Sequence, residues 1–367
     1  MAADVQVGTA DHYPLSSAFS FLEDPDGQLT LDDVIAPDQQ RRFQPVSTQL
    51  AGQGPNFGLS TSVYWLRITV AVEPGTPREW LLDVAYPPLD RVEVYSPDPA
   101  FGYERQVGGD HLPFAQRPFA HRHHVFPVSL PTGTHALYLR LQSEGTISAP
   151  VTLWRPAALS AIDQASYSAL SLYFGLLLGL LLYNLLLYVS VREPGYLSYV
   201  AFVAAMGMGQ AALSGLGAQF LWPEWPRWTR VSVPVALSAT AVFGLLFARS
   251  FLSSAARMPA LDRVLVVQLG CWLLAALAGL VLPYKVAAHM VMSLAPVTVL
   301  SIVAAGVISI RRGFAGARYF FAAWAVLLAG VLTLLLHDVG VLPSHPLTVH
   351  SLLIGSALEM VLLSFAL

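Results

Sequence analysis

The stretch that decides the fold is YFGLLLGLLLYNLLLYVSVREPGYLSY, residues 173–199. From Ser166 to Ser190 the chain carries no charged side chain, and this length exceeds the ~20 apolar residues that a helix needs to cross a bilayer. Before this stretch apolar and polar residues alternate between turn signals, and after it long apolar runs follow one another. We therefore predict that it forms the first of several membrane spans.

The composition fits a soluble domain joined to a membrane domain. Hydrophobic residues make up 55% of the 367 residues and charged residues only 12%, which is too apolar for an ordinary soluble protein. Residues 1–164 contain 10 basic and 18 acidic residues (net −8), whereas residues 165–367 contain 10 basic and 5 acidic residues (net +5). This pattern gives no indication of nucleic-acid binding. The single cysteine, Cys271, excludes an intrachain disulfide framework and CxxC metal sites.

Residues 1–160 predict an all-β jelly-roll sandwich. In SVYWLRITVAV the period-2 alternation places Tyr64 and Leu66 on one face and Trp65 and Arg67 on the other. EWLLDVAY and HALYLRLQ repeat the pattern, and Pro- and Gly-containing turn signals separate the strands. Six or more such strands without a convincing helical period favour a sandwich, and the jelly roll is the commonest choice for a binding module.

Three kinds of side chain in this domain are candidates for ligand binding. Trp65 lies on the face opposite the Leu/Val side and could stack on a sugar. Four arginines could grip a carboxylate or sugar acid, although they could also be rim charges that pair with the excess of Asp and Glu. The ligand-binding candidates are Trp65, Arg67, Arg117, His121, Arg122 and His123, with Arg140 as the fourth arginine.

The histidines are also candidate metal ligands. His121 and His123 would face the same side of a strand, as paired metal ligands do. A third ligand at a defined spacing is missing, so the pattern favours a solvated strand edge over a metal site. We therefore assign no metal and no cofactor.

Residues 161–367 predict an all-α bundle of seven transmembrane helices. The apolar runs end at turn chemistry such as REPG at 192–195 and LPS at 342–344. They lie at about 167–190, 196–220, 231–252, 264–283, 286–310, 319–337 and 348–367.

The charges of the loops predict the orientation. The loops after spans one, three and five carry seven arginines, whereas those after spans two and four carry Arg227, Arg230 and Lys285. The positive-inside rule places the first group and the C-terminus in the cytoplasm and the β domain outside the cell membrane. We expect a signal peptide upstream of Met1 for export of this domain. The WPEWPRW segment, residues 222–228, predicts an aromatic belt at the outer interface.

Polar and small residues inside the spans are candidates for coupling or packing. Glu359 should face the bundle and find a partner or a proton there, in a switching role or a structural hydrogen bond. Asn184 has the same two interpretations. Gly175 and Gly179 form a GxxxG pair, for which packing within the bundle is favoured over a dimer seam.

Both halves of the chain resemble the bacterial seven-transmembrane receptors with diverse intracellular signalling modules. In the membrane half the resemblance rests on the stretch from Tyr173 and on GLGAQFLWPEWP, LLFARSFL, ALDRVL, RRGFAGARYFFAAW and IGSALEMVLLSFAL. In the β domain it rests on VYWLRITV, WLLDVAYPPLDRVEVY, GGDHLPFAQRP and HVFPVSLPTGTHALYLRLQS. These segments are similar to the family's type-2 extracellular domain, a jelly roll like carbohydrate-binding modules.

The resemblance implies a receptor that senses a periplasmic small molecule or carbohydrate and signals through seven helices in the lipid bilayer. In such proteins the output is a cytoplasmic diguanylate cyclase, histidine kinase or related module after span seven. Residues 1–367 contain no GGDEF or kinase motif, so we expect the output to lie beyond residue 367. Because such outputs work as dimers, we also expect a homodimer.

Other functions have weaker support. A retinal protein needs an intramembrane lysine, but the only lysine, Lys285, lies at a loop boundary. A transporter would be expected to show an internal repeat and charged or broken helices near the middle of the membrane. The sequence shows neither clearly. No GxSxG or HExxH motif is present, so we predict no enzyme activity in these residues. The alternative is a membrane-anchored carbohydrate-binding or adhesion module without signalling.

Overall fold

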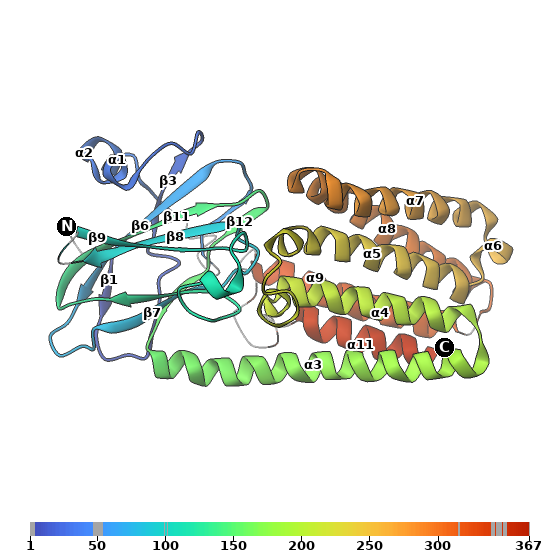
Figure 1. Ribbon diagram of the computed structural model, residues 1–367. Helices are drawn as coiled ribbons and strands as arrows, with labels where there is room; N and C mark the ends of the chain where they lie inside the picture. Colours follow the sequence, from blue (N-terminus) through green and yellow to red (C-terminus); the bar gives the residue numbers. More distant parts are fainter. Residues whose placement is uncertain are drawn as a thin grey trace. The chain divides into compact units, whose positions relative to one another are not determined.

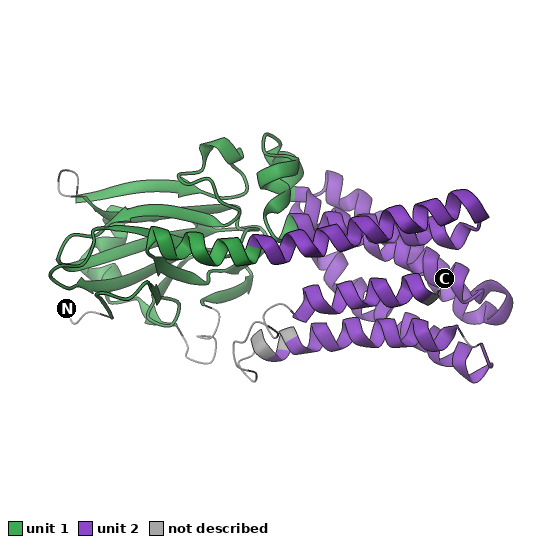
Figure 2. Ribbon diagram, turned by 90° about the horizontal axis from the view of Figure 1, so that it is seen from below, with its two compact units in different colours: residues 1–166, 212–230 green, residues 167–211, 231–367 purple. Residues whose placement is uncertain are grey.

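The computed structural model describes residues 4–46, 54–98, 100, 102–314, 316–338, 342, 347 and 351–366. The chain divides into two units, which Figure 2 shows in different colours. Unit 1 contains residues 1–166 and 212–230, and unit 2 contains residues 167–211 and 231–367. Unit 1 is β-rich and unit 2 is helical, so the predicted β domain followed by a helical bundle is confirmed.

Unit 1 is built on a seven-stranded sheet and a four-stranded sheet (Figure 1). The larger sheet has the order β4–β3–β6–β11–β8–β9, and β1 pairs in parallel with β6. Its strands are β1 (Val5–Val7), β3 (Ser20–Asp24), β4 (Gln44–Pro45), β6 (Val63–Val72), β8 (Arg91–Asp98), β9 (Gly102–Gly108) and β11 (Gly133–Gln142). The smaller sheet has the order β10 (His124–Ser129), β7 (Glu79–Val84), β13 (Val151–Trp154) and β2 (His12–Pro14), and β5 (Asn56–Leu59) pairs with β12 (Thr146–Ser148).

The alternation in the strands produces the core between these sheets. Leu66 and Leu139 are paired across β6 and β11, and both are fully buried. On β7 the same side chains that the alternation grouped together, Trp80 and Leu82, belong to this core. The predicted inward faces of the strands are therefore confirmed.

Two short helices cover part of the other face of the large sheet. α1 (Leu31–Ile35) begins at Thr30, which forms a capping box with Asp33, and α2 (Pro37–Gln40) follows at once. Val34 of α1 is buried against Trp65 and Tyr138 in a second, smaller apolar cluster. The sequence reasoning missed these helices, although Thr30 and Asp33 have the spacing of a capping box.

Residues 212–230 return to unit 1 after the second long helix. α4 (Pro194–Leu213) ends before the predicted limit at 220, because Gly215 adopts a left-handed φ of 79° and a π-helical turn, η3 (Gly217–Leu221), follows. A Cβ on Gly215 would collide with the backbone oxygen of Arg122, so the close approach of this segment requires glycine.

Unit 2 contains the helices that cover the predicted spans. Five are long and apolar enough to cross a membrane, and two further helices contain apolar stretches at 317–333 and 351–365. Residues 348–350 and 367 of the predicted seventh span lie outside the described residues. In chain order the helices are α3 (Pro156–Val191), α4, α5 (Pro226–Phe251), the short α6 (Ser254–Arg257), α7 (Pro259–Val281), α8 (Tyr284–Arg311), α9 (Ala317–Asp338) and α11 (Ser351–Ala366).

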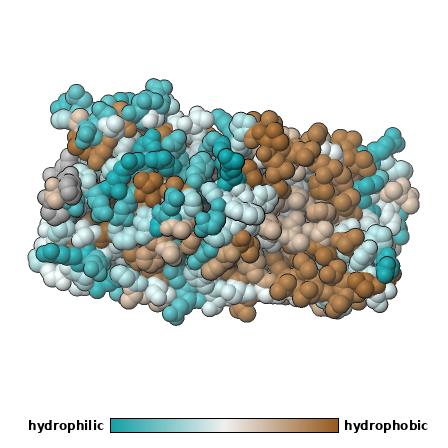
Figure 3. Space-filling view, viewed as in Figure 1, coloured by the Kyte–Doolittle hydropathy of each residue, from teal (hydrophilic) through white to brown (hydrophobic). Residues whose placement is uncertain are grey.

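The surface of these helices is apolar. Figure 3 shows hydrophobic side chains over most of the helical face that it presents. On α3, Leu172 and Leu186 are more than two-thirds exposed, and exposed leucines on this scale indicate a lipid-facing surface.

Candidate ligand-binding site

A buried carboxylate lies at the centre of the outer face of β8. Glu93 accepts hydrogen bonds from Arg91 Nε (2.7 Å), Arg105 Nε (2.9 Å) and Tyr95 Oη (2.6 Å), and Arg140 Nη1 lies 3.5 Å away. Burial raises the pKa of Glu93, but the hydrogen bonds from Arg105, Tyr95 and Arg91 outweigh burial and lower the pKa to about 2. Glu93 is therefore ionised, and three guanidinium groups share its single negative charge.

A cavity of about 470 Å³ lies over this cluster. The side chains of Arg91 and Arg105 remain about half exposed, so they keep donors for a ligand. The excess of positive charge suits a ligand that carries a carboxylate or another anion beside hydroxyl groups. Besides the Glu93 cluster, the cavity is lined by Trp65, Gln142 and residues 27–31.

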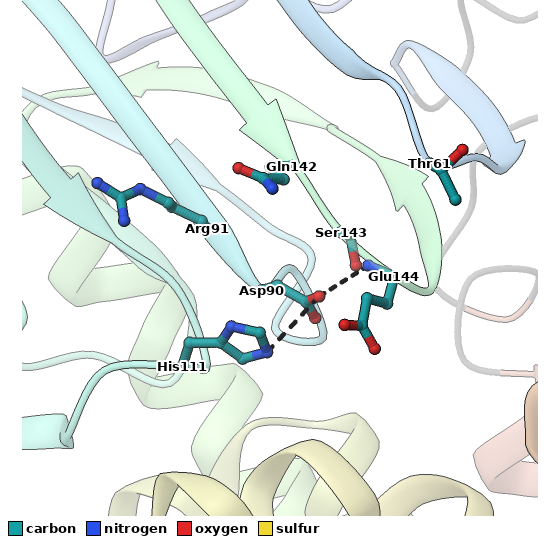
Figure 4. A pocket seen from close by; sticks show the side chains of 7 residues that line it. All are labelled: Thr61, Asp90, Arg91, His111, Gln142, Ser143 and Glu144. Atoms are coloured by element: carbon teal, nitrogen blue, oxygen red, sulfur yellow. Dashed lines mark hydrogen bonds and ion pairs between the residues drawn. The ribbon is translucent and has the colours of Figure 1, made fainter. Parts of the chain in front are cut away.

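A smaller pocket of about 240 Å³ shares Arg91 and Gln142 with this cavity (Figure 4). Asp90 and His111 point toward each other in it, with Asp90 Oδ2 3.6 Å from His111 Nε2. The backbone N–H of Glu144 donates to Asp90 Oδ2 (2.7 Å). Thr61 and Ser143 complete the lining.

Trp65 and Arg67 lie on the face that the alternation predicts. Trp65 is fully buried, with its ring 5.6 Å from that of Tyr95. It therefore lies under the larger cavity as part of the second apolar cluster and exposes no ring face. Arg67 donates to Gln40 Oε1 (2.5 Å) and lies over the ring of Phe43, so α2 and the residues after it cover this side chain.

The other four candidates lie together in another part of unit 1. Arg117 donates to the backbone oxygen of His121 (3.0 Å), and its guanidinium lies over Phe114. Arg122 donates to Ser166 Oγ (2.8 Å) and to the backbone oxygen of Ser214 (3.4 Å). The fourth arginine, Arg140, lies elsewhere and contacts the carboxylate of Glu93. The six predicted ligand-binding residues therefore do not converge on one pocket.

The histidine cluster is buried, so the expectation of a solvated strand edge is wrong. His121 and His124 are each at most 3% exposed. Because the His123 N–H donates to His121 Nδ1 (3.0 Å), His121 Nε2 carries the proton and donates to Asp163 Oδ1 (3.0 Å). Burial, and secondarily His123, lowers the pKa of His121, and burial lowers the pKa of His124 to about 3.

A third potential metal ligand, which the sequence pattern lacked, lies beside these histidines. Asp83, on β7 beside β10, lies 3.2 Å from His123 Nδ1 and forms a group with His121 and His123 that could hold a metal ion. The sequence reasoning missed it because strand pairing, rather than spacing along the chain, places it there.

Several contacts among the described residues hold residues 212–230 against the sandwich. Besides the bond from Arg122 to Ser214, the Phe114 N–H donates to the backbone oxygen of Pro223 (2.9 Å), and Arg230 Nη2 lies 2.5 Å from Glu144 Oε2. Trp222, which the sequence places in an aromatic belt, is buried beside Gly217, whereas Trp225 is largely exposed. The segment between α4 and α5 is therefore part of unit 1.

The predicted intramembrane polar residues are both fully buried in unit 2. Asn184 Nδ2 donates to Leu180 O and to Ser364 Oγ (both 2.8 Å). Neither carboxylate oxygen of Glu359 has a hydrogen-bond partner among the described residues. Asn184 therefore ties α3 to α11, whereas Glu359 carries no structural hydrogen bond within the described part of the chain.

Two of the quoted membrane motifs meet in an ion pair that the sequence reasoning did not identify. Arg249 of LLFARSFL donates twice to Asp262 of ALDRVL (2.8 and 3.0 Å), and Ser254 Oγ donates to the same carboxylate (2.5 Å). This network joins the end of α5 to the start of α7.

Comparison with known families agrees with this architecture. The family described as 7TM diverse intracellular signalling matches residues 166–367. The domain described as 7TMR-DISM extracellular 2 matches residues 16–155. No curated protein matches the chain.

Proposed function

Because the chain belongs to the seven-transmembrane receptors with diverse intracellular signalling modules, we propose that its β-sandwich binds a small polar periplasmic ligand and that the helices transmit its occupancy to a cytoplasmic output. The observation that carries the proposal is the order of the two family matches, an extracellular domain at 16–155 followed by the membrane domain at 166–367. The output is a module such as a diguanylate cyclase or a histidine kinase. The described domains themselves bind and transmit, without catalysis.

The ligand class follows from the larger cavity. Its floor is aromatic and its rim carries Arg91, Arg105 and Gln142. Guanidinium groups that already share one carboxylate prefer a planar anionic group, and the amide of Gln142 suits hydroxyls. We therefore propose a carbohydrate-like molecule that bears an acidic group, such as a sugar acid.

The route from ligand to helices runs through two connections. One is the covalent link from β13 to α3, residues 154–163. The other is the segment 212–230, whose docking on the sandwich continues along the chain into α5. A ligand changes the equilibrium between two receptor states only if it binds one of them better, and both connections bring a change in the sandwich to the start of a membrane helix.

The membrane placement rests on the loop charges. The seven arginines after spans one, three and five support a multi-pass inner-membrane protein with its sandwich in the periplasm and its C-terminus in the cytoplasm.

The test is a thermal-unfolding screen of the whole chain in detergent against neutral sugars, sugar acids and organic acids. A ligand that binds the folded sandwich raises the unfolding temperature. We expect a sugar acid to do so with the wild type and with the control Arg42→Ala, whose side chain bonds only Gln39 on the surface, but not with Arg105→Gln. An equal shift in Arg105→Gln would contradict this pocket.

A second measurement separates a receptor from an adhesion module. Hydrogen exchange of residues 212–230 with and without ligand should change in a receptor. Binding without any such change would favour an adhesion module.

A further inference from the structure

Two side chains that line the smaller pocket, Asp90 and His111, form a group with the buried Asp110 that the ligand proposal does not use. Asp90 directly precedes β8, and Asp110 and His111 follow the end of β9. These strand ends are adjacent because β8 and β9 pair antiparallel, with Val92 opposite Gly108. The fold therefore places two carboxylates and one imidazole at one end of the sheet, and Figure 4 shows two of these side chains, Asp90 and His111.

The backbone fixes this juxtaposition. The Asp110 N–H donates to the backbone oxygen of Leu89 (2.9 Å), and the His111 N–H donates to that of Asp90 (3.3 Å). Gly109 between the strand and this turn has a φ of 137°, and a Cβ there would collide with the Asp90 oxygen. The positions of all three residues are thus determined by main-chain contacts rather than by the side chains themselves.

The side chains lack mutual hydrogen bonds that would satisfy them. Asp110 is 93% buried, yet its Oδ1 has no hydrogen-bond partner among the described residues. His111 Nε2 lies 3.6 Å from Asp90 Oδ2 and 3.9 Å from Asp110 Oδ1, beyond good hydrogen-bond length. Burial and the neighbouring Asp90 raise the pKa of Asp110 well above its usual range. An unpartnered buried oxygen beside a second carboxylate is an arrangement that a bound cation would stabilise.

The separations suit a metal ion. The three ligand atoms lie within 4.8 Å of one another. Ligands about 2.0–2.2 Å from a common tetrahedral ion lie about 3.4 Å apart, so side-chain movements of about 1 Å or less would bring these atoms into coordination. The pocket leaves room for water or for the Glu144 carboxylate at the remaining position.

The other His–Asp group is less suited to this role. His121 uses Nδ1 to accept from the His123 N–H and Nε2 to donate to Asp163, and His123 Nδ1 already faces Asp83. A metal there would have to break these hydrogen bonds. Asp110 Oδ1 has none to lose among the described residues.

We propose that Asp90, Asp110 and His111 bind a divalent transition-metal ion. The imidazole favours ions such as Zn²⁺, Mn²⁺ or Co²⁺ over Ca²⁺ and Mg²⁺, which prefer oxygen ligands alone. The ion also affects the segment 212–230. Arg230 interacts electrostatically with Asp110 and pairs with Glu144, so a dication in this pocket repels Arg230 and competes with it for both carboxylates. Metal binding therefore loosens the contact between the sandwich and the start of α5.

The test uses the whole chain in detergent, without a histidine tag and stripped of metal by a chelator. Titration with Zn²⁺, Mn²⁺ or Co²⁺, followed by calorimetry and by the absorption spectrum of Co²⁺, should show one site. Asp110→Asn and His111→Ala should each lower the affinity by at least about tenfold, since loss of even an outer hydrogen-bond partner of a ligand costs 10–100-fold. His121→Gln, in the other cluster, should bind as the wild type does.

Two further measurements distinguish a loss of metal binding from misfolding of the variants. Asp110→Asn removes the repulsion with Asp90, so without metal it should unfold at or above the wild-type temperature. Added metal should speed hydrogen exchange of residues 222–230 in the wild type but not in Asp110→Asn. Absence of binding by the wild type, equal binding by Asp110→Asn and His111→Ala, or loss of binding in His121→Gln would overturn the assignment. None of these results depends on whether the larger cavity binds a sugar acid.

Discussion

Arg230 Nη2 lies 2.5 Å from Glu144 Oε2, although 86 positions separate the two residues in the chain. Glu144 lines the smaller pocket of the sandwich, and Arg230 belongs to the first turns of α5. The ion pair thus joins a pocket wall to the residue after which the chain enters the membrane unit.

This pair should matter for signalling more than for stability. Both side chains are about 40% exposed, so Glu144→Gln should cost at most about 1 kcal/mol of unfolding free energy. Hydrogen exchange of residues 222–230 should nevertheless rise clearly, because the ion pair that holds Arg230 to the sandwich is lost. The charge-swapped pair Glu144→Arg with Arg230→Glu should restore protection, and a failure of this rescue would show that the contact acts by shape rather than by charge.

The stability of the sandwich should fall in mild acid. The folded-state pKa of His124 is about 3, below the ordinary value of 6.5, because the ring is buried. Above pH 6.5 the ring is neutral in the folded and the unfolded protein, so the free energy of unfolding is fully retained. As the pH falls from 6.5 toward 3, the unfolded protein takes up a proton that the folded protein does not, and the free energy of unfolding falls by up to about 1.4 kcal/mol per pH unit. Urea unfolding followed by pulse proteolysis at pH 7 and pH 5 measures the decline.

A neutral residue at position 124 is the control for this pH dependence. His124→Gln keeps a donor for the Pro87 oxygen, which His124 Nε2 now contacts at 3.0 Å. Its stability should fall less between pH 7 and pH 5 than that of the wild type. The same slope in both proteins would assign the acid sensitivity to other groups, with His121 the next candidate.

Trp65 should behave as a core residue. It is fully buried between the large sheet and the α1–α2 segment, so Trp65→Ala should cost about 3–5 kcal/mol. Trp65→Phe should be milder, because the indole N–H has no hydrogen-bond partner among the described residues to lose. Thermal unfolding without ligand tests both variants, and a loss of ligand affinity without a loss of stability would restore Trp65 as a stacking residue.

Glu359 should be dispensable for folding. No hydrogen bond within the described residues would be lost in Glu359→Gln, and the cost of burying a carboxyl group in the bundle would fall. We expect wild-type yield and thermal stability in detergent, together with an altered ligand response if the residue couples the helices. Asn184→Leu is the contrasting variant, since it removes the bond to Ser364 and should destabilise the bundle by about 1 kcal/mol. A severe folding defect in Glu359→Gln would instead assign the carboxylate a structural partner.

Gly175 and Gly179 should affect association. Among the described residues a Cβ at either position would meet no atom within 4 Å, so the predicted packing of this pair within the bundle is not found there. The open stripe supports the homodimer that the family resemblance leads us to expect. Gly179→Ile should weaken dimers seen by sedimentation in detergent and leave the thermal stability of the monomer unchanged, whereas Gly207→Ile, next to Leu177 within the bundle, should lower that stability. Unchanged dimers in Gly179→Ile would place the dimer contact elsewhere.

Local patterns predicted the elements but not what covers them. Alternation assigned Leu66 to the core and Trp65 to the opposite face correctly, because side-chain direction in a strand depends only on position. It could not show that α1 and α2 would bury Trp65. The contacts of Asp83 with His123 and of Glu144 with Arg230 join segments that are far apart in the chain, so no spacing along the sequence could predict them.

Hydropathy likewise predicted the helices but not the tertiary contacts that end them. The predicted spans overlap the helices of unit 2, since a bilayer demands uninterrupted apolar length, but α3 begins at Pro156, before the predicted start at 167. Hydropathy extended α4 past Leu213, because GLGAQFLW is apolar enough to continue a span. The left-handed Gly215 and its contact with Arg122 end the helix there, and only the folded sandwich supplies that contact.

The composite make-up of unit 1 has a practical consequence for receptor engineering. Residues 1–166 and 212–230 complete one another, so the sensor is not a single contiguous cassette. A chimera that grafts a foreign sandwich before α3 but retains the native 212–230 would confront Gly215 and Arg230 with a mismatched surface. Transplants of both stretches together are the ones that should yield sensors with exchanged specificity.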